Sequence, residues 1–191
     1  HGGATAEGQI AVLASYGVTE TNVGAPILSS METVCLGHVR GDIPVYFDRV
    51  AASLDGIILM NRVKPHTDFH APYESGLVKQ MVIGLGNHLG AQLVHSYGLL
   101  GLQELIPEMG ALILTKAPIL GGVAVLENAK DQTAVIKVLA REEILPEEPG
   151  LLEKARQLLP RLPVSDIDLL IVEEMGKNIS GVGMDPNITG R

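Results

Sequence analysis

The sequence predicts an α/β fold: a mostly parallel sheet flanked by helices, with a β-hairpin and the start of a second α/β domain. Two apolar runs, 57–60 and 167–172, have the length and continuity of strands buried in a parallel sheet. Helical patterns alternate with strand patterns along the chain. Each apolar run leads into a polar loop rich in glycine, which is where α/β proteins place their binding groups.

The composition is that of a globular protein that binds neither nucleic acid nor a membrane. The chain has 191 residues, 46% of them hydrophobic, and a net charge of −8. A negative charge argues against nucleic acid, because phosphate binding needs a basic surface. No apolar run approaches the ~20 residues that span a bilayer, so no membrane partner is expected. The single cysteine, Cys35, excludes an internal disulfide, fits a cytoplasmic location and is expected to be a small buried side chain.

The first elements follow from periodicity and caps. Residues 4–16 are expected to be helical, because Ile10, Leu13 and Ala14 share one face. Strands are expected at 32–39 and 45–47, then a helix at 49–54 and a strand at 57–60. The order strand, helix, strand, with a wholly apolar last strand, indicates parallel pairing.

The later elements are predicted in the same way. Helices are expected at 76–83, 87–97, 99–109 and 150–159, and strands at 111–114, 122–126, 133–139 and 167–172. The turn 128–132 indicates a β-hairpin. The acidic segment 141–149, which holds two prolines, is expected to be a linker.

This linker divides the chain into two expected domains. Residues 1–140 would form the catalytic α/β domain, and 141–191 the linker, helix and first strand and loop of a second lobe. The chain begins at His1 and stops at Arg191 just after a glycine-rich loop. Neither end resembles a natural terminus, so the chain is expected to be a fragment that lacks its N-terminal part.

The segment 61–95 carries most of the candidate chemistry, because it holds four of the six histidines. His66 follows the apolar strand, between Pro65 and Thr67, with Asp68 nearby. A neutral imidazole beside a carboxylate is suited to moving protons at physiological pH. A surface or capping histidine is the alternative, and His70 is a rival for the same role.

Lys79 and His95 are the other candidates in this segment. Lys79 lies in an apolar stretch, 77–83, where its stem could snorkel to water. If it is buried, the pKa of its amine falls and the amine becomes a nucleophile or a covalent anchor. His95 lies on a helical pattern, where a histidine is either structural or a metal ligand.

The same segment bears on three other functions: dinucleotide binding, metal-dependent lysis or hydrolysis, and binding without catalysis. The run Gly84-x-Gly86-x-x-x-Gly90 is one residue too long for a dinucleotide-binding fingerprint. His66, Asp68 and His70 together could bind the metal of a lyase or hydrolase. A metal- or nucleotide-binding module without catalysis is the non-enzyme alternative.

Taken in order, these residues resemble the nickel-dependent lactate racemase family. The resemblance rests on His1 before the helix at 4–16, His66 after the strand at 57–60, and Lys79 after Ser75-Gly76. His95 follows Lys79 by sixteen residues. The loop Gly181-x-Gly-Met-Asp-Pro-Asn-Ile188 is similar to a loop of that family's second domain.

The resemblance implies a racemase or epimerase of 2-hydroxy acids. Its cofactor would be a nickel-pincer nucleotide (pyridinium-3-thioamide-5-thiocarboxylic acid mononucleotide), anchored on Lys79 through a thioamide and flanked by Ser75 and Gly76. His95 would ligate the nickel, and His1 and His66 would be the acid/base pair on the two faces of the substrate. The C2 hydride would pass reversibly to the pincer ring.

Two further expectations come with the resemblance. The family's Gly-Gly-Arg before the lysine is here Gly76-Leu77-Val78, so Arg62 or Arg191 would bind the substrate. The expected partners are a small 2-hydroxy acid and further copies of the chain in a homo-oligomer.

Overall fold

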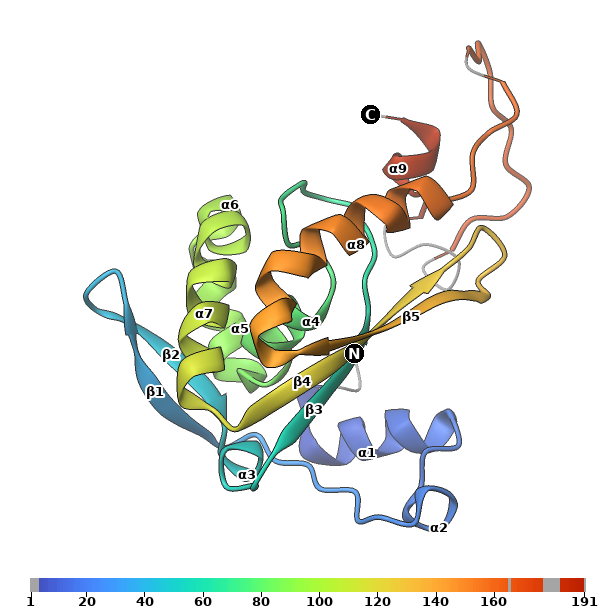
Figure 1. Ribbon diagram of the computed structural model, residues 1–191. Coiled ribbons are helices and arrows are strands. Elements are labelled where there is room, and N and C mark those ends of the chain that lie inside the picture. Colours follow the sequence, from blue (N-terminus) through green and yellow to red (C-terminus); the bar gives the residue numbers. More distant parts are fainter. Residues whose placement is uncertain (1–3, 165, 177–182, 191) are drawn as a thin grey trace.

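A computed structural model describes residues 4–164, 166–176 and 183–190 of the chain (Figure 1). His1, Gly181 and Arg191, all named above, lie outside these residues. The helices are α1 (Ala6–Ser15), α2 (Glu20–Val23), α3 (Arg49–Ala52), α4 (Leu77–Lys79), α5 (Asn87–Ser96), α6 (Gly98–Leu100), α7 (Ile106–Lys116), α8 (Ile144–Leu158) and α9 (Pro186–Thr189). The strands are β1 (Thr33–Val39), β2 (Ile43–Asp48), β3 (Ile57–Arg62), β4 (Ile119–Glu127) and β5 (Thr133–Ala140).

The described strands form two small sheets, so an α/β chain is confirmed but the mostly parallel sheet is wrong. β1 and β2 pair antiparallel as a hairpin, and β3–β4–β5 form a separate sheet. Only β3 and β4 are parallel, because β5 returns antiparallel along β4. Eight residues separate β2 from β3. A parallel crossover needs a dozen or more, so these two strands cannot pair in the expected way.

The hairpin predicted around 128–132 is confirmed. The Asn128 side-chain oxygen accepts the backbone N–H of Lys130 at 2.9 Å and that of Gln132 at 3.1 Å. This is the local hydrogen bonding by which asparagine favours tight turns. The turn places the ends of β4 and β5 beside the end of β3, where the loop containing His66 begins (Figure 1).

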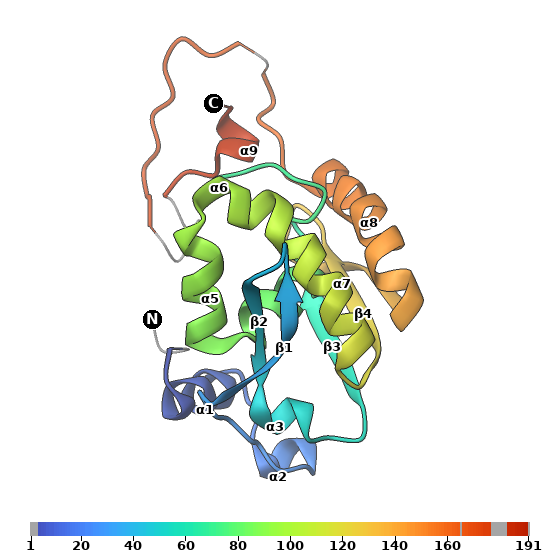
Figure 2. The ribbon, with the colours of Figure 1, turned by 90° about the vertical axis from the view of Figure 1, so that its left-hand side faces the viewer.

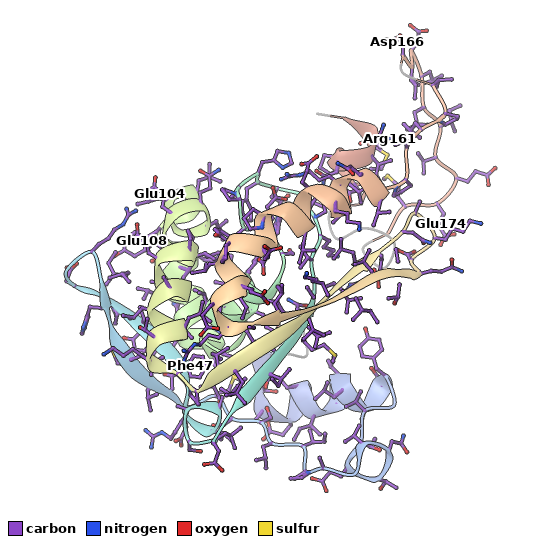
Figure 3. All side chains as sticks on the ribbon, in the orientation of Figure 1. Phe47, Glu104, Glu108, Arg161, Asp166 and Glu174 are labelled. Atoms are coloured by element: carbon purple, nitrogen blue, oxygen red, sulfur yellow. The ribbon has the colours of Figure 1, made fainter. Side chains whose placement is uncertain are left out.

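One face of the three-stranded sheet holds the core. Helices α4, α5, α7 and α8 gather on this side, while α1 and α2 lie below β3 in Figure 1 and toward the bottom of Figure 2. The core includes Phe47, which Figure 3 labels among these elements, with Leu77, Ile113 and Leu139, all less than 2% exposed. Ile58, Met60, Ile136 and Val138 are instead exposed. Because side chains alternate along a strand, these four share the opposite face of the sheet.

Three segments and Cys35 differ from the prediction. Residues 111–114 belong to α7, whose buried side includes Met109 and Ile113. A short apolar run does not distinguish a buried strand from a buried helix.

The expected linker 141–149 is helical, and its Ile144 lies in the core. Residues 167–172 form no strand and leave Leu169 and Ile171 exposed, in the segment whose tip carries Asp166 in Figure 3. Cys35 is also exposed, at an irregularity in the β1–β2 pairing.

The helix that carries Lys79 is irregular. α4 continues without a break into a π-helical segment, Gln80–Gly84. α5 begins at Asn87, whose φ of 51° lies in the left-handed region. A Cβ on Gly86 would collide with the carbonyl oxygen of Val82, so only glycine fits this close approach.

Candidate functional site

The loop between β3 and α4 is organised by Glu74, a buried carboxylate that is 1% exposed. Its Oε2 accepts the backbone N–H of His66 at 2.6 Å, and its Oε1 accepts that of Ala71 at 3.0 Å. The loop is closed at its base, where the N–H of Lys64 donates to the carbonyl of Ser75 at 2.9 Å. Glu74 therefore fixes the backbone position of His66.

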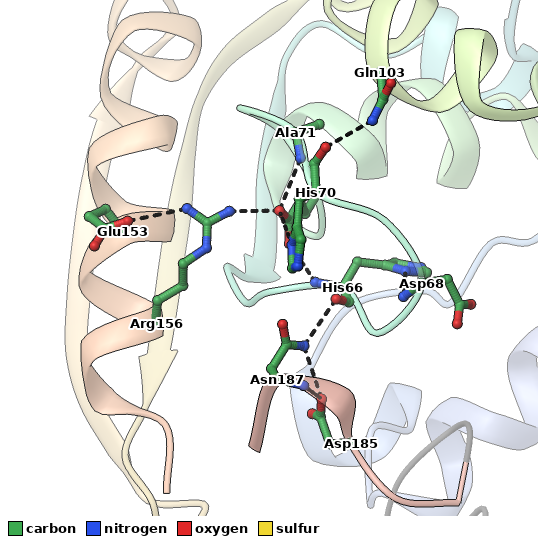
Figure 4. A network of polar contacts seen from close by, with 10 residues as sticks. His66, Asp68, His70, Ala71, Gln103, Glu153, Arg156, Asp185 and Asn187 are labelled. Atoms are coloured by element: carbon green, nitrogen blue, oxygen red, sulfur yellow. Dashed lines mark hydrogen bonds and ion pairs between the residues drawn. The ribbon is translucent and has the colours of Figure 1, made fainter. Parts of the chain in front are cut away.

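Glu74 also ties the loop to α8. Nη2 of Arg156 donates to Glu74 Oε1 at 2.6 Å, and the imidazole of His70 lies 3.3 Å from the same oxygen (Figure 4). A buried carboxylate is costly unless it is paired and hydrogen-bonded, and here four donors surround it. Sequence reasoning did not identify Glu74 or Arg156, since they are 82 residues apart.

His66 has a defined orientation in this loop. Its Nδ1 accepts the backbone N–H of Asp68 at 3.1 Å, and its ring centroid lies 4.6 Å from that of Phe69. Its carbonyl accepts the side-chain amide of Asn187 at 3.0 Å, so α9 lies against this loop (Figure 4). Because Nδ1 is an acceptor, the neutral ring carries its proton on Nε2.

Burial lowers the pKa of His66, and the nearby charge of Lys79 lowers it further. Asp68 and Glu74 act in the opposite direction. Protonating Nδ1 would also replace an accepted hydrogen bond by two facing donors. The neutral Nε2–H form is thus favoured near pH 7.

Lys79 lies on the other side of Phe69. Its Nζ is 5.3 Å from the centroid of that ring. Desolvation by burial lowers the pKa of the amine, although Glu74 and Asp68 oppose this. Within the described ranges, Nζ has no hydrogen-bonding or ion-pairing partner. A half-buried amine with a lowered pKa has a larger neutral, nucleophilic fraction than an exposed lysine.

Gly76 and Glu148 form the start of the helix that bears Lys79. Glu148 of α8 is 1% exposed, and its Oε2 accepts the N–H of Leu77 at 2.7 Å and that of Val78 at 3.1 Å. A carboxylate at this position satisfies the unpaired donors of a helix N-terminus. The carbonyl of Gly76 accepts the side-chain amide of Asn61 at 2.9 Å, which connects α4 to β3.

A cavity of about 650 Å³ lies beside the loop. It is bounded by the end of β3, the β4–β5 turn, the end of α8 and the C-terminal segment. His66, Ser75, Arg62 and Lys64 line it, whereas neither Lys79 nor His95 does. Arg62 pairs with Glu127 at 2.6 Å, and the ammonium of Lys64 makes no ion pair with any described residue.

The metal predictions concern His95 and the group of His66, Asp68 and His70. His95 is exposed in the last turn of α5. Nowhere in 4–164, 166–176 or 183–190 do three His, Cys, Asp or Glu side chains lie where they could hold a metal ion. In the three residues of the lyase or hydrolase alternative, Nδ1 of His66 accepts the backbone N–H of Asp68 and the ring of His70 faces Glu74, and that alternative stays a prediction.

None of the helices in the described ranges combines the length and apolar character needed to cross a bilayer. Comparisons with protein-family models, with curated proteins and with solved structures each gave no match.

Proposed function

We propose that this chain is the catalytic part of a racemase or epimerase of 2-hydroxy acids, with His66 as a proton-transfer group and Lys79 as the anchor of a nickel-pincer nucleotide. One observation carries the proposal. The two side chains that the sequence singles out lie against the same buried ring, Phe69, and both have lowered pKa values. Neighbouring titratable groups with perturbed pKa values are typical of catalytic sites, and one of the two, His66, lines the cavity.

The orientation of His66 supports proton transfer to and from the substrate oxygen. With Nδ1 held by the N–H of Asp68, the neutral ring can donate a hydrogen bond from Nε2 to a substrate oxygen. This would hold the hydroxyl or keto oxygen and return a proton to it as the alcohol forms. The second proton-transfer group expected for inversion, His1, lies outside the described residues.

The anchor fits the chemistry of Lys79. Forming a thioamide needs a neutral amine, and the burial of Nζ, which forms no ion pair with any described residue, favours that form against the opposing charges of Glu74 and Asp68. When bound, the nickel-pincer nucleotide would supply a reversible hydride acceptor. Ser75 and Gly76 would flank the anchor, and the contact of His95 with nickel stays a prediction.

The cavity supports a small organic acid as the substrate. A volume of about 650 Å³ suits a small organic acid together with part of a cofactor. Lys64, in its lining, forms no ion pair within the described part of the chain and could bind a carboxylate, while Arg62 would have to exchange Glu127 for the substrate. We therefore assign the substrate carboxylate to Lys64 first and to Arg62 second.

The proposal is tested on chain co-produced with the cofactor-forming enzymes. Intact mass, a peptide map and nickel analysis should show an adduct on Lys79 and bound nickel. Chiral chromatography should show racemisation of lactate or a longer 2-hydroxy acid. Lys79→Ala should lose the adduct, whereas His66→Ala should keep the adduct and lose turnover.

Lys116→Ala is the matched control, because this exposed lysine lies in the last turn of α7 and outside the cavity lining. It should retain both adduct and turnover. Protein without an adduct and without C2 inversion under these conditions would overturn the proposal.

A further inference from the structure

Helix α8 contacts both reactive segments through two side chains eight positions apart, Glu148 and Arg156. Residues separated by seven or eight positions share one face of a helix. The same face buries Leu152 and Ala155 in the core, so α8 is fixed against the sheet. Its two polar contacts are therefore made from a rigid support.

The first contact is with the helix that carries Lys79. Glu148 accepts the N–H groups of Leu77 and Val78, the first two residues of α4. These donors have no intrahelical partner, and α4 is too short to persist without support. Lys79 is the last residue of α4, so the position of its stem depends on this contact.

The second contact is with the loop of His66. Arg156 binds Glu74, and Glu74 binds the backbone N–H of His66. The guanidinium bridges Glu74 and Glu153, which also restricts its own rotation (Figure 4). Charge-assisted bonds to a buried acid are the stronger class of hydrogen bond in proteins.

We propose that α8 positions the reactive pair, with Glu148 holding the helix of Lys79 and Arg156 holding the loop of His66 through Glu74. Both are positioning residues, since Glu148 binds backbone N–H groups of α4 and Arg156 binds Glu74, and neither binds Nζ of Lys79 or the imidazole of His66. The role of α8 in catalysis rests on the proposed function, whereas the contacts of Glu148 and Arg156 are those of the chain without ligand.

The two contacts predict that each substitution changes the pKa of a different group. Removing Arg156 releases Glu74 and the loop, so the imidazole of His66 becomes more solvated. Removing Glu148 frays the first turn of α4, so the amine of Lys79 becomes more solvated. Solvation returns a pKa toward its ordinary value, which is upward for both groups.

The experiment measures two midpoints in the chain without cofactor. The His66 midpoint comes from an NMR titration of its ring, and the Lys79 midpoint from the pH dependence of its modification by an amine reagent, read by peptide mapping. Arg156→Leu should raise the His66 midpoint by about half a unit or more and move the Lys79 midpoint less. Glu148→Ala should do the reverse, and Glu148→Gln, which keeps an acceptor oxygen, should restore the Lys79 midpoint.

Matched controls separate positioning from a general loss of charge. Arg161→Leu and Glu147→Ala change exposed residues at neighbouring positions and should leave both midpoints in place. If Glu148→Ala does not fold, Glu148→Asp, which shortens the side chain by one methylene, takes its place. Equal movement of both midpoints in each variant, or movement of neither, overturns the inference.

These readouts do not depend on turnover. Selective shifts in a chain that never acquires an adduct would leave α8 as the support of the loop and refute the racemase. Turnover together with unselective shifts would refute the role of α8 alone.

Discussion

Gly76 and Glu148 occupy adjoining space that admits no further carbon atom. A Cβ on Gly76 would lie 2.5 Å from Oε1 of Glu148. The φ of Gly76 is 179°, an extended value open to any residue, so glycine is required here by space and not by backbone conformation. The carboxylate is buried and bound to two N–H groups, so it cannot simply move aside.

Gly76→Ala should therefore destabilise the fold by about 1–3 kcal/mol, the usual cost of overpacking. Urea unfolding monitored by circular dichroism measures this change. Gly150→Ala is the matched control, because a Cβ there meets nothing within 4 Å and Gly150 lies inside α8. It should stabilise the protein by up to about 1 kcal/mol through helix propensity. Equal effects of the two substitutions would contradict this account of Gly76.

Glu148 should make stability depend on pH. Burial raises its pKa to about 7 from 4.5, against the two backbone N–H bonds, which lower it. The folded chain then keeps a proton on Glu148 that the unfolded chain releases, so the contribution of Glu148 to stability is greatest below pH 4.5 and falls as the pH rises to 7. The loss should be about 3 kcal/mol at most.

Unfolding free energies measured between pH 4.5 and pH 8 should show this decline, and Glu148→Gln should remove it. Glu147→Gln, on the exposed side of α8, should keep it. A decline of the same size in Glu148→Gln would assign the pH dependence to another group.

The charge of Lys79 should be detectable at His66. Lys79 lowers the pKa of His66, so Lys79→Met should raise the NMR titration midpoint of that ring, by a few tenths of a unit across the partly solvated distance. Lys79→Arg retains the charge and should keep the midpoint low. A midpoint that stays in place in Lys79→Met would show that the charge of Lys79 does not act on His66 in solution.

Asn187 should hold the C-terminal segment against the site. Its amide donates to the carbonyl of His66 at 3.0 Å, and its side chain and backbone both bind Asp185. Asn187→Ala should weaken this contact by about 1 kcal/mol and speed amide hydrogen exchange in α9. Thr189→Ala removes an exposed bond within α9 and serves as the control. Unchanged exchange in Asn187→Ala would mean that α9 is held elsewhere.

Local signals predicted much of this structure. The helix at 4–16, the hairpin around Asn128 and the strand at 57–60 all formed near their expected positions, because caps, turns and periodicity act over a few residues. His66 and Lys79 were singled out by local signals too, His66 as a histidine after an apolar strand and Lys79 as a charge within an apolar stretch, and their roles stay predictions.

Contacts between residues far apart in the sequence could not be predicted from caps, turns and periodicity. Glu74 reads as an ordinary loop acid until Arg156 is placed beside it, and Glu148 reads as one of several acids in a segment that looked like a linker. The run 167–172 has the composition of a buried strand, but a strand needs a neighbour, and none of the described strands pairs with it. Composition alone does not supply that neighbour.

The π-helical segment after Lys79 has a consequence for insertions and deletions. A π-turn holds one residue more than an α-helical turn, so deleting one residue within 80–84 could leave a continuous α-helix. Because the π-turn absorbs the extra residue, the turns before and after it would keep their facing, and Lys79, which precedes it in a helix held by Glu148, would stay beside Phe69. Chains that differ by a single residue at this point should therefore share both the fold and the position of the lysine.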